Sequence, residues 1–180
     1  MAVARNLWGY IDRRDHRLMR RLNRWRAPRW IRIWMLAATR MGDGWIWYGL
    51  GLMLLAYGGP QRFSAVGAAA VLGIFVFKAL KRLSQRPRPC QIEPHCWSKV
   101  LPPDQFSFPS GHTMTASSIA IVVSYFYPAL EGVLFFLVLS IAVSRIVLGM
   151  HFLSDVLAGV VMGVALGCAS ITAFASFGLI

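Results

Sequence analysis

Acidic residues are scarce in this chain: its 180 residues include seven Asp or Glu against 19 Lys or Arg, giving a formal net charge of +12. They are scattered, with no obvious cluster, at Asp12, Asp15, Asp43, Glu93, Asp104, Glu131 and Asp155. Magnesium and calcium sites need several carboxylates close together. The sequence therefore predicts chemistry that uses no metal ion and no cofactor, with fixed positive charges as the binding groups for anions.

Cysteine is also scarce, with three residues in the chain. Cys90 and Cys96 are close enough in sequence to form a disulfide if their loop meets an oxidising compartment, and two free thiols are an equal alternative. A zinc site that also includes His95 is a weaker alternative. Cys168 lies within an apolar run, where we expect it to serve packing.

Charged residues make up 14% of the chain and hydrophobic residues 57%, which excludes an ordinary small soluble domain. Long apolar runs predict membrane-spanning helices at about 43–59, 62–82, 110–128, 132–150 and 153–177. The expected fold class is therefore all-α, an integral membrane helical bundle of about five transmembrane helices. In the last span glycine recurs every fourth residue, at Gly159, Gly163 and Gly167. This spacing predicts a helix-packing seam, within the monomer in preference to between monomers.

The first 40 residues are expected to form a basic arm, and residues 41–180 the membrane domain. The arm lacks the uninterrupted apolar core of a secretion signal. Wound as a helix, it places arginines on one face and on the other Leu7, Ile11, Leu18, Leu22 and Trp25. This pattern predicts an in-plane amphipathic helix that binds anionic lipids, with Trp30 and Trp34 among its interfacial anchors. Nucleic acid is not an expected partner of a chain with so many spans.

Three polar motifs lie at ends of the predicted spans. Their key residues are Lys81 and Arg88 after the second span, Ser110, Gly111 and His112 at the start of the third, and Arg145, His151 and Asp155 between the fourth and fifth. Counting crossings places all three motifs on the same side of the membrane. They are therefore predicted to converge in one site.

The third motif has the pattern of an activated nucleophile. If a helix starts near residue 152, His151 and Asp155 are four residues apart on one face. The aspartate can then accept a proton from one imidazole nitrogen and leave the other nitrogen free to attack. Arg145 offers a planar cationic fork that suits a phosphate.

The second motif has the pattern of an anion-binding helix start. Ser110 can cap the helix, and Gly111 allows a close backbone approach. The free amides and the dipole of such a helix end favour an anion, which Lys81 and Arg88 would also attract. His112 would be placed to donate a proton to a leaving oxygen.

Together the motifs resemble the three signatures of the type-2 phosphatidic acid phosphatase family. The first is a lysine followed after six residues by Arg-Pro, which Lys81 and Arg88-Pro89 fit. Pro109-Ser110-Gly111-His112 fits the second, and Ser144-Arg145 with His151 and Asp155 at the required spacing fits the third. The resemblance extends from about residue 40 to the C-terminus. Arg86-Pro87 is out of register, and the family spacing selects Arg88 instead.

The resemblance implies a membrane-embedded lipid phosphate phosphatase with a helical core shared with vanadium haloperoxidases. It implies that His151 attacks phosphorus to form a phosphohistidine, that Asp155 orients His151, and that His112 protonates the leaving group. It also implies a set of phosphate-binding positions at Lys81, Arg88, Ser110, Gly111 and Arg145. Water would then hydrolyse the intermediate.

The substrate class expected from this resemblance is a lipid phosphate or diphosphate, such as undecaprenyl diphosphate, phosphatidylglycerol phosphate or phosphatidic acid. The headgroup, the lipid chain, the preference for monophosphate or diphosphate and the oligomeric state are left open by the sequence. Two alternatives compete with hydrolysis. One is phosphotransfer to a lipid acceptor through the same phosphohistidine, and the other is a non-enzymatic lipid-binding or transport protein.

The expected location is a bacterial-type plasma membrane, with two alternatives for the side that the site faces. In the predicted topology, Arg62 is the only Lys or Arg on the side opposite the motifs. Because positive charge is retained in the cytoplasm, this bias favours a cytoplasmic site. The family resemblance instead implies an extracytoplasmic site, as in most bacterial members.

Overall fold

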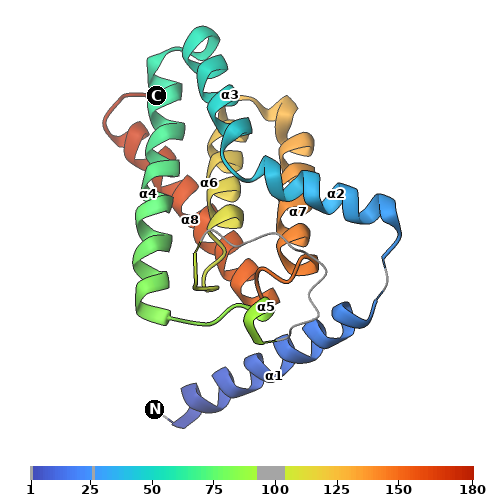
Figure 1. Cartoon of the computed structure of the whole chain (residues 1–180). Coiled ribbons are helices and arrows are strands. Elements are labelled where there is room, and N and C mark those ends of the chain that lie inside the picture. The colour runs from blue at the N-terminus through green and yellow to red at the C-terminus, as the bar shows by residue number, and fades with distance from the viewer. Residues whose placement is uncertain (1, 26, 93–103) are drawn as a thin grey trace.

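The computed structural model describes residues 2–25, 27–92 and 104–180 (Figure 1). Over these residues the chain is all helical, without a β-strand, as predicted. The elements are α1 (Ala2–Arg24), α2 (Arg29–Met41), α3 (Trp45–Met53) with a π-helical turn (Leu54–Gly58), α4 (Pro60–Ser84), α5 (Pro89–Ile92), α6 (Gly111–Phe126), a 3₁₀ turn (Pro128–Leu130), α7 (Glu131–Val147) and α8 (Leu153–Ser176).

The five predicted spans correspond to α3, α4, α6, α7 and α8. Within the described part of the chain, three helices are long and apolar enough to cross a membrane: α4, Pro128–Val147 and α8. The other two are shorter, because α6 has 16 residues and so extends only about 24 Å. Most residues of α6 are buried among its neighbours, so this helix contacts protein rather than lipid over most of its surface.

The central helix α6 packs against α4, α7 and α8, and its contact with α8 is the closest. A Cβ atom at Gly159 would lie 2.7 Å from the carbonyl oxygen of Ser110, and one at Gly167 would lie 2.8 Å from Cβ of Ile121. At Gly163 the backbone of α6 comes closer still. The predicted glycine seam is therefore confirmed, and it lies within the monomer.

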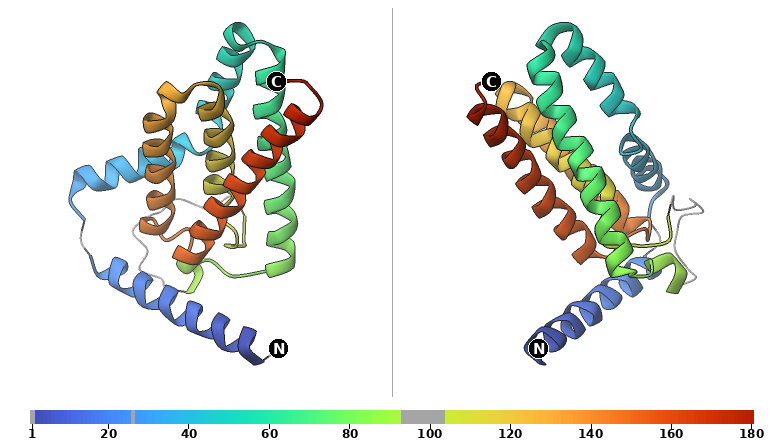
Figure 2. Two further views of the ribbon diagram at one scale, coloured as in Figure 1. Left: turned by 180° about the vertical axis from the view of Figure 1, so that it is seen from behind. Right: turned by 90° about the vertical axis from the view of Figure 1, so that its left-hand side faces the viewer.

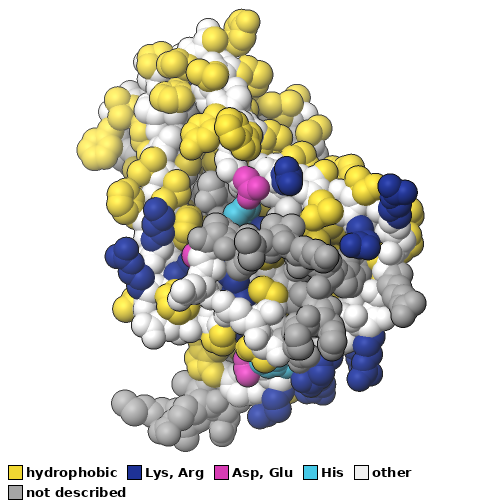
Figure 3. Space-filling view, in the orientation of Figure 1, with side chains coloured by type: hydrophobic (Ala, Val, Ile, Leu, Met, Phe, Trp, Pro, Cys, Tyr) yellow, Lys and Arg dark blue, Asp and Glu magenta, His cyan; other side chains and the backbone are white. Residues whose placement is uncertain are grey.

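One end of the bundle collects all the motif-bearing termini. α4 and α7 end there, α6 and α8 begin there, and α1 runs crosswise beyond that end, whereas α2 crosses nearer the middle of the bundle, against α7 (Figures 1 and 2). The C-terminus and the α3–α4 turn lie at the opposite end. Hydrophobic side chains cover that far half of the surface, whereas Lys and Arg gather around the motif end (Figure 3). The predicted convergence of the three motifs is confirmed.

One face of α1 lies against the protein, and the predicted contact of this helix with anionic lipid stays a prediction. Asp15 and Met19 are buried on that face, while Arg13, Arg17 and Arg20 are exposed on the other. An amphipathic pattern reveals that a face is covered, but protein and lipid cover it equally well. Trp8 and Trp25 are exposed, and α2 also exposes large apolar side chains, at Trp30, Ile33 and Trp34.

We predict that Gly163→Ala lowers the free energy of unfolding by about 1–3 kcal/mol, because a methyl group there must push α8 away from the backbone of α6. Gly132→Ala is the matched control, since nothing lies within 4 Å of a Cβ atom at that position of α7. Thermal unfolding in detergent, followed by circular dichroism, measures both. Equal unfolding temperatures for the two variants would contradict the close contact.

Candidate active site

The structure brings all eight predicted site residues to the motif end of the bundle. A cavity of about 620 Å³ is lined there by Lys81, Arg88, Gly111, His112, Arg145 and His151. Ser110 and Asp155 are fully buried behind this lining, where the backbone N–H of Ser110 donates to the backbone carbonyl of Asp155 at 3.0 Å. The start of α6 is thereby joined to the start of α8.

The two ring nitrogens of His151 have different partners. Nδ1 lies 2.6 Å from the carbonyl oxygen of Ser107, and Nε2 lies 3.2 Å from Nη1 of Arg88. A carbonyl oxygen can only accept a hydrogen bond, and a guanidinium can only donate one. These partners assign the proton to Nδ1 and leave the lone pair on Nε2, which faces the cationic cavity.

The environment of His151 also keeps its ring neutral. Complete burial lowers the pKa of His151 well below its ordinary value, and the positive charges of Arg145, Arg88 and Lys81 lower it further. At neutral pH the imidazole is therefore uncharged. This is the protonation state that a nucleophilic histidine requires.

Asp155 does not make the hydrogen bond to His151 that the spacing predicted. Its Oδ2 lies 3.8 Å from Nδ1 of His151 and instead accepts from the backbone N–H of Phe152 at 2.8 Å. The helix begins at Leu153, so Asp155 caps it from the third position while Ser107 holds the imidazole. Asp155 Oδ1 accepts a hydrogen bond from Arg86 at 2.7 Å. Ser107 could not be predicted from the sequence, because any residue can supply a backbone acceptor.

The cations Lys81 and Arg88 are bridged by a carboxylate that the sequence analysis did not single out. Lys81 Nζ and Arg88 Nη2 each lie 2.6 Å from an oxygen of Asp104. Burial alone would raise the pKa of Asp104, but the hydrogen bonds and charges of Lys81 and Arg88 outweigh it and lower the pKa, so Asp104 is ionised. An internal anion therefore occupies the two cations that were predicted to bind phosphate.

Arg145 has N–H groups that bind no described residue. Its side chain is buried, and Nη1 donates to Oγ1 of Thr39 in α2 at 2.6 Å. Its Nε and Nη2 have no hydrogen-bond partner among the described residues. A buried guanidinium with two unpaired N–H groups favours an anionic ligand, because unsatisfied charged donors are costly.

His112 is held by the turn between α2 and α3. Its Nε2 lies 2.7 Å from Oδ1 of Asp43, and a Cβ atom at Gly42 would lie 2.7 Å from Cδ2 of its ring. On this side His112 also lines a second cavity of about 620 Å³, together with Trp47 and Phe77. The ring therefore stands between a cationic cavity and one with aromatic walls, which Arg40, Asp43 and Arg145 also line.

The start of α6 differs in detail from the prediction. Ser110 is the N-cap residue, but its hydroxyl pairs with that of Thr113 at 2.9 Å and caps no backbone amide. Gly111 leaves room for the side chain of Phe77, since a Cβ atom at position 111 would lie 3.2 Å from that ring. Among the described residues Cys90 forms no disulfide. Cys96 and His95 lie outside them, so the predicted disulfide or zinc site stays a prediction.

Comparisons with known proteins identify the family of this chain. Residues 63–178 match the family model of the PAP2 superfamily. The chain is 33% identical over 140 residues to decaprenylphosphoryl-5-phosphoribose phosphatase of Mycobacterium tuberculosis, which covers 74% of this chain and 77% of the relative. It is also 33% identical over 134 residues to phosphatidylglycerophosphatase B of Bacillus subtilis, covering 67% of this chain and 55% of the relative.

Two solved structures have the same architecture. A transmembrane PAP2 type phosphatidylglycerolphosphate phosphatase from Bacillus subtilis superimposes with a TM-score of 0.75 at 22% identity, covering 91% of this chain and 85% of that one. Aquifex aeolicus LpxE superimposes with a TM-score of 0.74 at 28% identity, covering 87% and 93%. The first of these likenesses bears on the fold alone.

We predict that Asp104→Asn strengthens binding of inorganic phosphate about three- to tenfold, because a neutral amide competes less well for Lys81 and Arg88. Isothermal titration calorimetry of the detergent-purified protein measures the affinity. Glu131→Gln, an exposed residue at the start of α7, is the control and should leave it unchanged. Weaker phosphate binding by Asp104→Asn would show that Asp104 orients the cations and does not compete with the ligand.

Proposed function

Because the chain belongs to the PAP2 superfamily and is an integral membrane phosphatase of the lipid phosphate class, we propose that it hydrolyses its substrate through a phosphohistidine formed at His151. The observation that carries this proposal is the lone pair of His151 Nε2, which faces Arg88 and the cationic cavity. The fixed charges of Lys81, Arg88 and Arg145 take the place that a metal ion holds in other phosphatases.

In the first step, the substrate phosphate displaces Asp104 from Lys81 and Arg88. Its oxygens also accept hydrogen bonds from Nε and Nη2 of Arg145. His151 Nε2 then attacks phosphorus, and the bond from phosphorus to the leaving oxygen breaks. The positive charge that forms on the ring is stabilised by the Ser107 carbonyl and by Asp155, 3.8 Å away.

The leaving oxygen needs a proton, which the pair of His112 and Asp43 can supply. A distance of 2.7 Å between Nε2 and Oδ1 requires one proton between them. That proton passes to the leaving oxygen, and the lipid alcohol departs. In the second step the pair accepts a proton from water, whose oxygen attacks phosphorus while the bond from phosphorus to Nε2 breaks.

The proposed substrate is a phosphate ester carried by a lipid headgroup. The two curated relatives are named for phosphatidylglycerophosphate and decaprenylphosphoryl-5-phosphoribose. The cavity beside His112 is lined by Trp47, Tyr48, Ile74 and Phe77. Apolar and aromatic walls next to the proton donor suit the lipid side of the bond that breaks.

The test is phosphate release by detergent-purified protein, with EDTA present throughout. The panel comprises phosphatidylglycerol phosphate, phosphatidic acid, a phosphorylated glycolipid and undecaprenyl diphosphate. We expect release from at least one monophosphate, a loss of about 10³-fold or more in His151→Ala, and an acid-labile ³²P label on the wild type alone. Release that requires a divalent ion, or equal release by the variant, would refute the mechanism. Label that passes to a lipid acceptor without free phosphate would indicate a phosphotransferase.

We further propose a bacterial plasma membrane with the motif end in the cytoplasm. The exposed arginines of α1 lie at that end. Near the other end, the described residues include a single Lys or Arg, which is Arg62. A C-terminal fusion reports the side, because the C-terminus lies at the far end (Figure 1). Alkaline phosphatase fused after Ile180 should be active in Escherichia coli and green fluorescent protein dark. The reverse pattern would place the site outside the cytoplasm.

A further inference from the structure

Arg86 lies two residues before the phosphate-site residue Arg88, and its guanidinium joins three segments of the chain. Nη1 donates to Oδ1 of Asp155 and to Oγ of Ser154, both at 2.7 Å. Nη2 donates to Oδ2 of Asp15 at 2.9 Å and to Oδ1 of Asp12 at 3.0 Å. The loop after α4, the start of α8 and the helix α1 therefore meet at one side chain.

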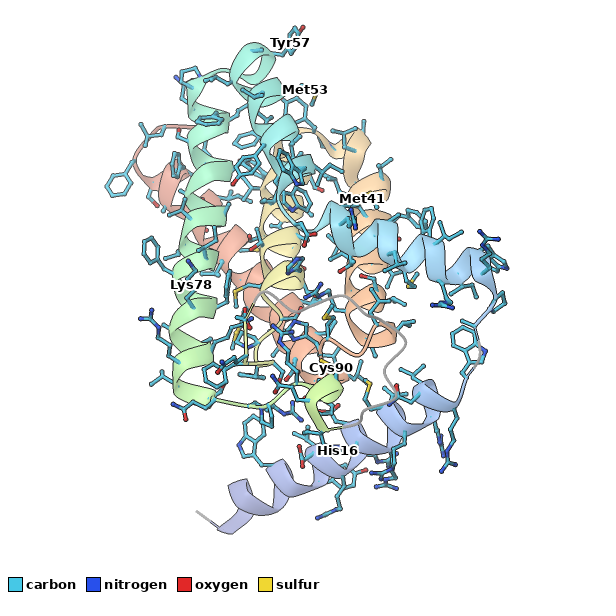
Figure 4. The ribbon with its side chains drawn as sticks, in the orientation of Figure 1. His16, Met41, Met53, Tyr57, Lys78 and Cys90 are labelled. Atoms are coloured by element: carbon cyan, nitrogen blue, oxygen red, sulfur yellow. The ribbon has the colours of Figure 1, made fainter. Side chains whose placement is uncertain are left out.

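The contact of α1 with the start of α8 is buried and hydrogen-bonded. Asp15 is 4% exposed, and besides Arg86 it accepts hydrogen bonds from both the backbone N–H and the hydroxyl of Ser154. The ring of Phe152 lies 4.3 Å from the Arg86 guanidinium carbon, and the ring of His16 packs edge-on against Phe152 at 5.0 Å. Figure 4 shows His16 on α1 at this end of the molecule. Polar and aromatic contacts thus fix α1 against the turn that carries His151.

Asp155 depends on this bridge for its charge. The carboxylate is fully buried, and an unpaired buried carboxylate is strongly disfavoured. Among the described residues, Arg86 is the cation in hydrogen-bond contact with it. Burial acts to lower the pKa of Arg86, but Asp155, Asp15 and Asp12 outweigh that effect and raise it, so the guanidinium stays charged.

Arg86 acts from behind the site and not within it. It lines neither of the two cavities that meet at His112, whereas Arg88 lines the cationic one. Four acceptors occupy its two terminal nitrogens, so those nitrogens have no free N–H for a phosphate. Both terminal nitrogens therefore bind protein acceptors and not the substrate.

We infer that Arg86 and Asp15 are positioning residues, which hold the Asp155 carboxylate beside His151 and make the N-terminal helix α1 part of the catalytic end. The inference rests on the proposed function, because it assigns the bridge to the step in which His151 becomes positively charged. When the Asp155 carboxylate is correctly placed, it stabilises that charge. When the bridge is broken, the carboxylate shifts or takes up a proton and the stabilisation is lost.

The experiment compares kcat, KM and inhibition by inorganic phosphate for Arg86→Gln, Arg86→Lys and Asp15→Asn. We expect kcat to fall about 10- to 100-fold in Arg86→Gln and about tenfold in Asp15→Asn, with KM and the phosphate inhibition constant within about twofold of wild type. Arg86→Lys should recover part of kcat, since it keeps the charge but cannot reach every acceptor. Arg17→Gln, which removes an exposed charge from the same helix, is the control and should match wild type.

Two outcomes overturn the inference. A raised KM or phosphate inhibition constant with unchanged kcat would make Arg86 a phosphate ligand. An unchanged kcat per folded molecule, with only a lower unfolding temperature, would make the bridge purely structural.

Failure of the proposed function is recognised separately. Wild-type protein that is inactive on the whole lipid panel, or a fully active His151→Ala, would remove the phosphatase assignment and the catalytic role of the bridge with it. The docking of α1 is still measured in that case, by a double-mutant cycle on thermal unfolding with Arg86→Gln and Asp15→Asn. Non-additive effects would confirm the contact, and additive effects would refute it.

Discussion

The burial of four cationic side chains at one end of an apolar helical bundle is the constraint on which this structure depends. Lys81, Arg86, Arg88 and Arg145 are buried or nearly so, and a buried charge is costly unless it is paired. The first three are paired with carboxylates, whereas Arg145 has Thr39 as its partner among the described residues. The chain has few acidic residues with which to pair them, yet it gathers most of those at this end: Asp12, Asp15, Asp43, Asp104 and Asp155. The few acidic residues of the chain are thus concentrated at one site.

Helix packing supplies the distances that this pairing needs. The glycine seam lets α8 approach the backbone of α6, and the Ser110 N–H bonds directly to the Asp155 carbonyl. The starts of the two helices are therefore fixed to each other, and with them His112 and His151. A looser packing of α8 would separate the two histidines before it disturbed either one alone.

Much of this could be predicted from the sequence, because the signals are local. Apolar runs located the helices, parity placed the motifs at one end, and motif spacing selected the residues that line the cavity. The partners of those residues could not be predicted. Asp104, Asp43 and Asp15 lie 16 to 139 residues away from the groups that they bind, and nothing in their neighbourhood marks them.

Two further differences have the same physical origin. The motif spacing pointed away from Arg86, because the spacing records contacts with a ligand and not contacts between protein side chains. The amphipathic pattern of α1 likewise showed that one face is covered but not by what. The structure places Asp15 and Met19 against the protein, while Ile11, Leu18 and Leu22 on the predicted apolar face are half-buried.

The carboxylate of Asp104, tethered to Lys81 and Arg88, has a consequence for an enzyme that works inside a bilayer. The bulk phospholipids around it carry a phosphodiester with a single negative charge, at concentrations far above those of a substrate. A phosphodiester does not displace the Asp104 carboxylate from the two cations, because both anions carry one negative charge. A terminal phosphate with two negative charges does displace it. The Asp104 carboxylate thereby keeps the bulk phospholipids of the membrane out of the site.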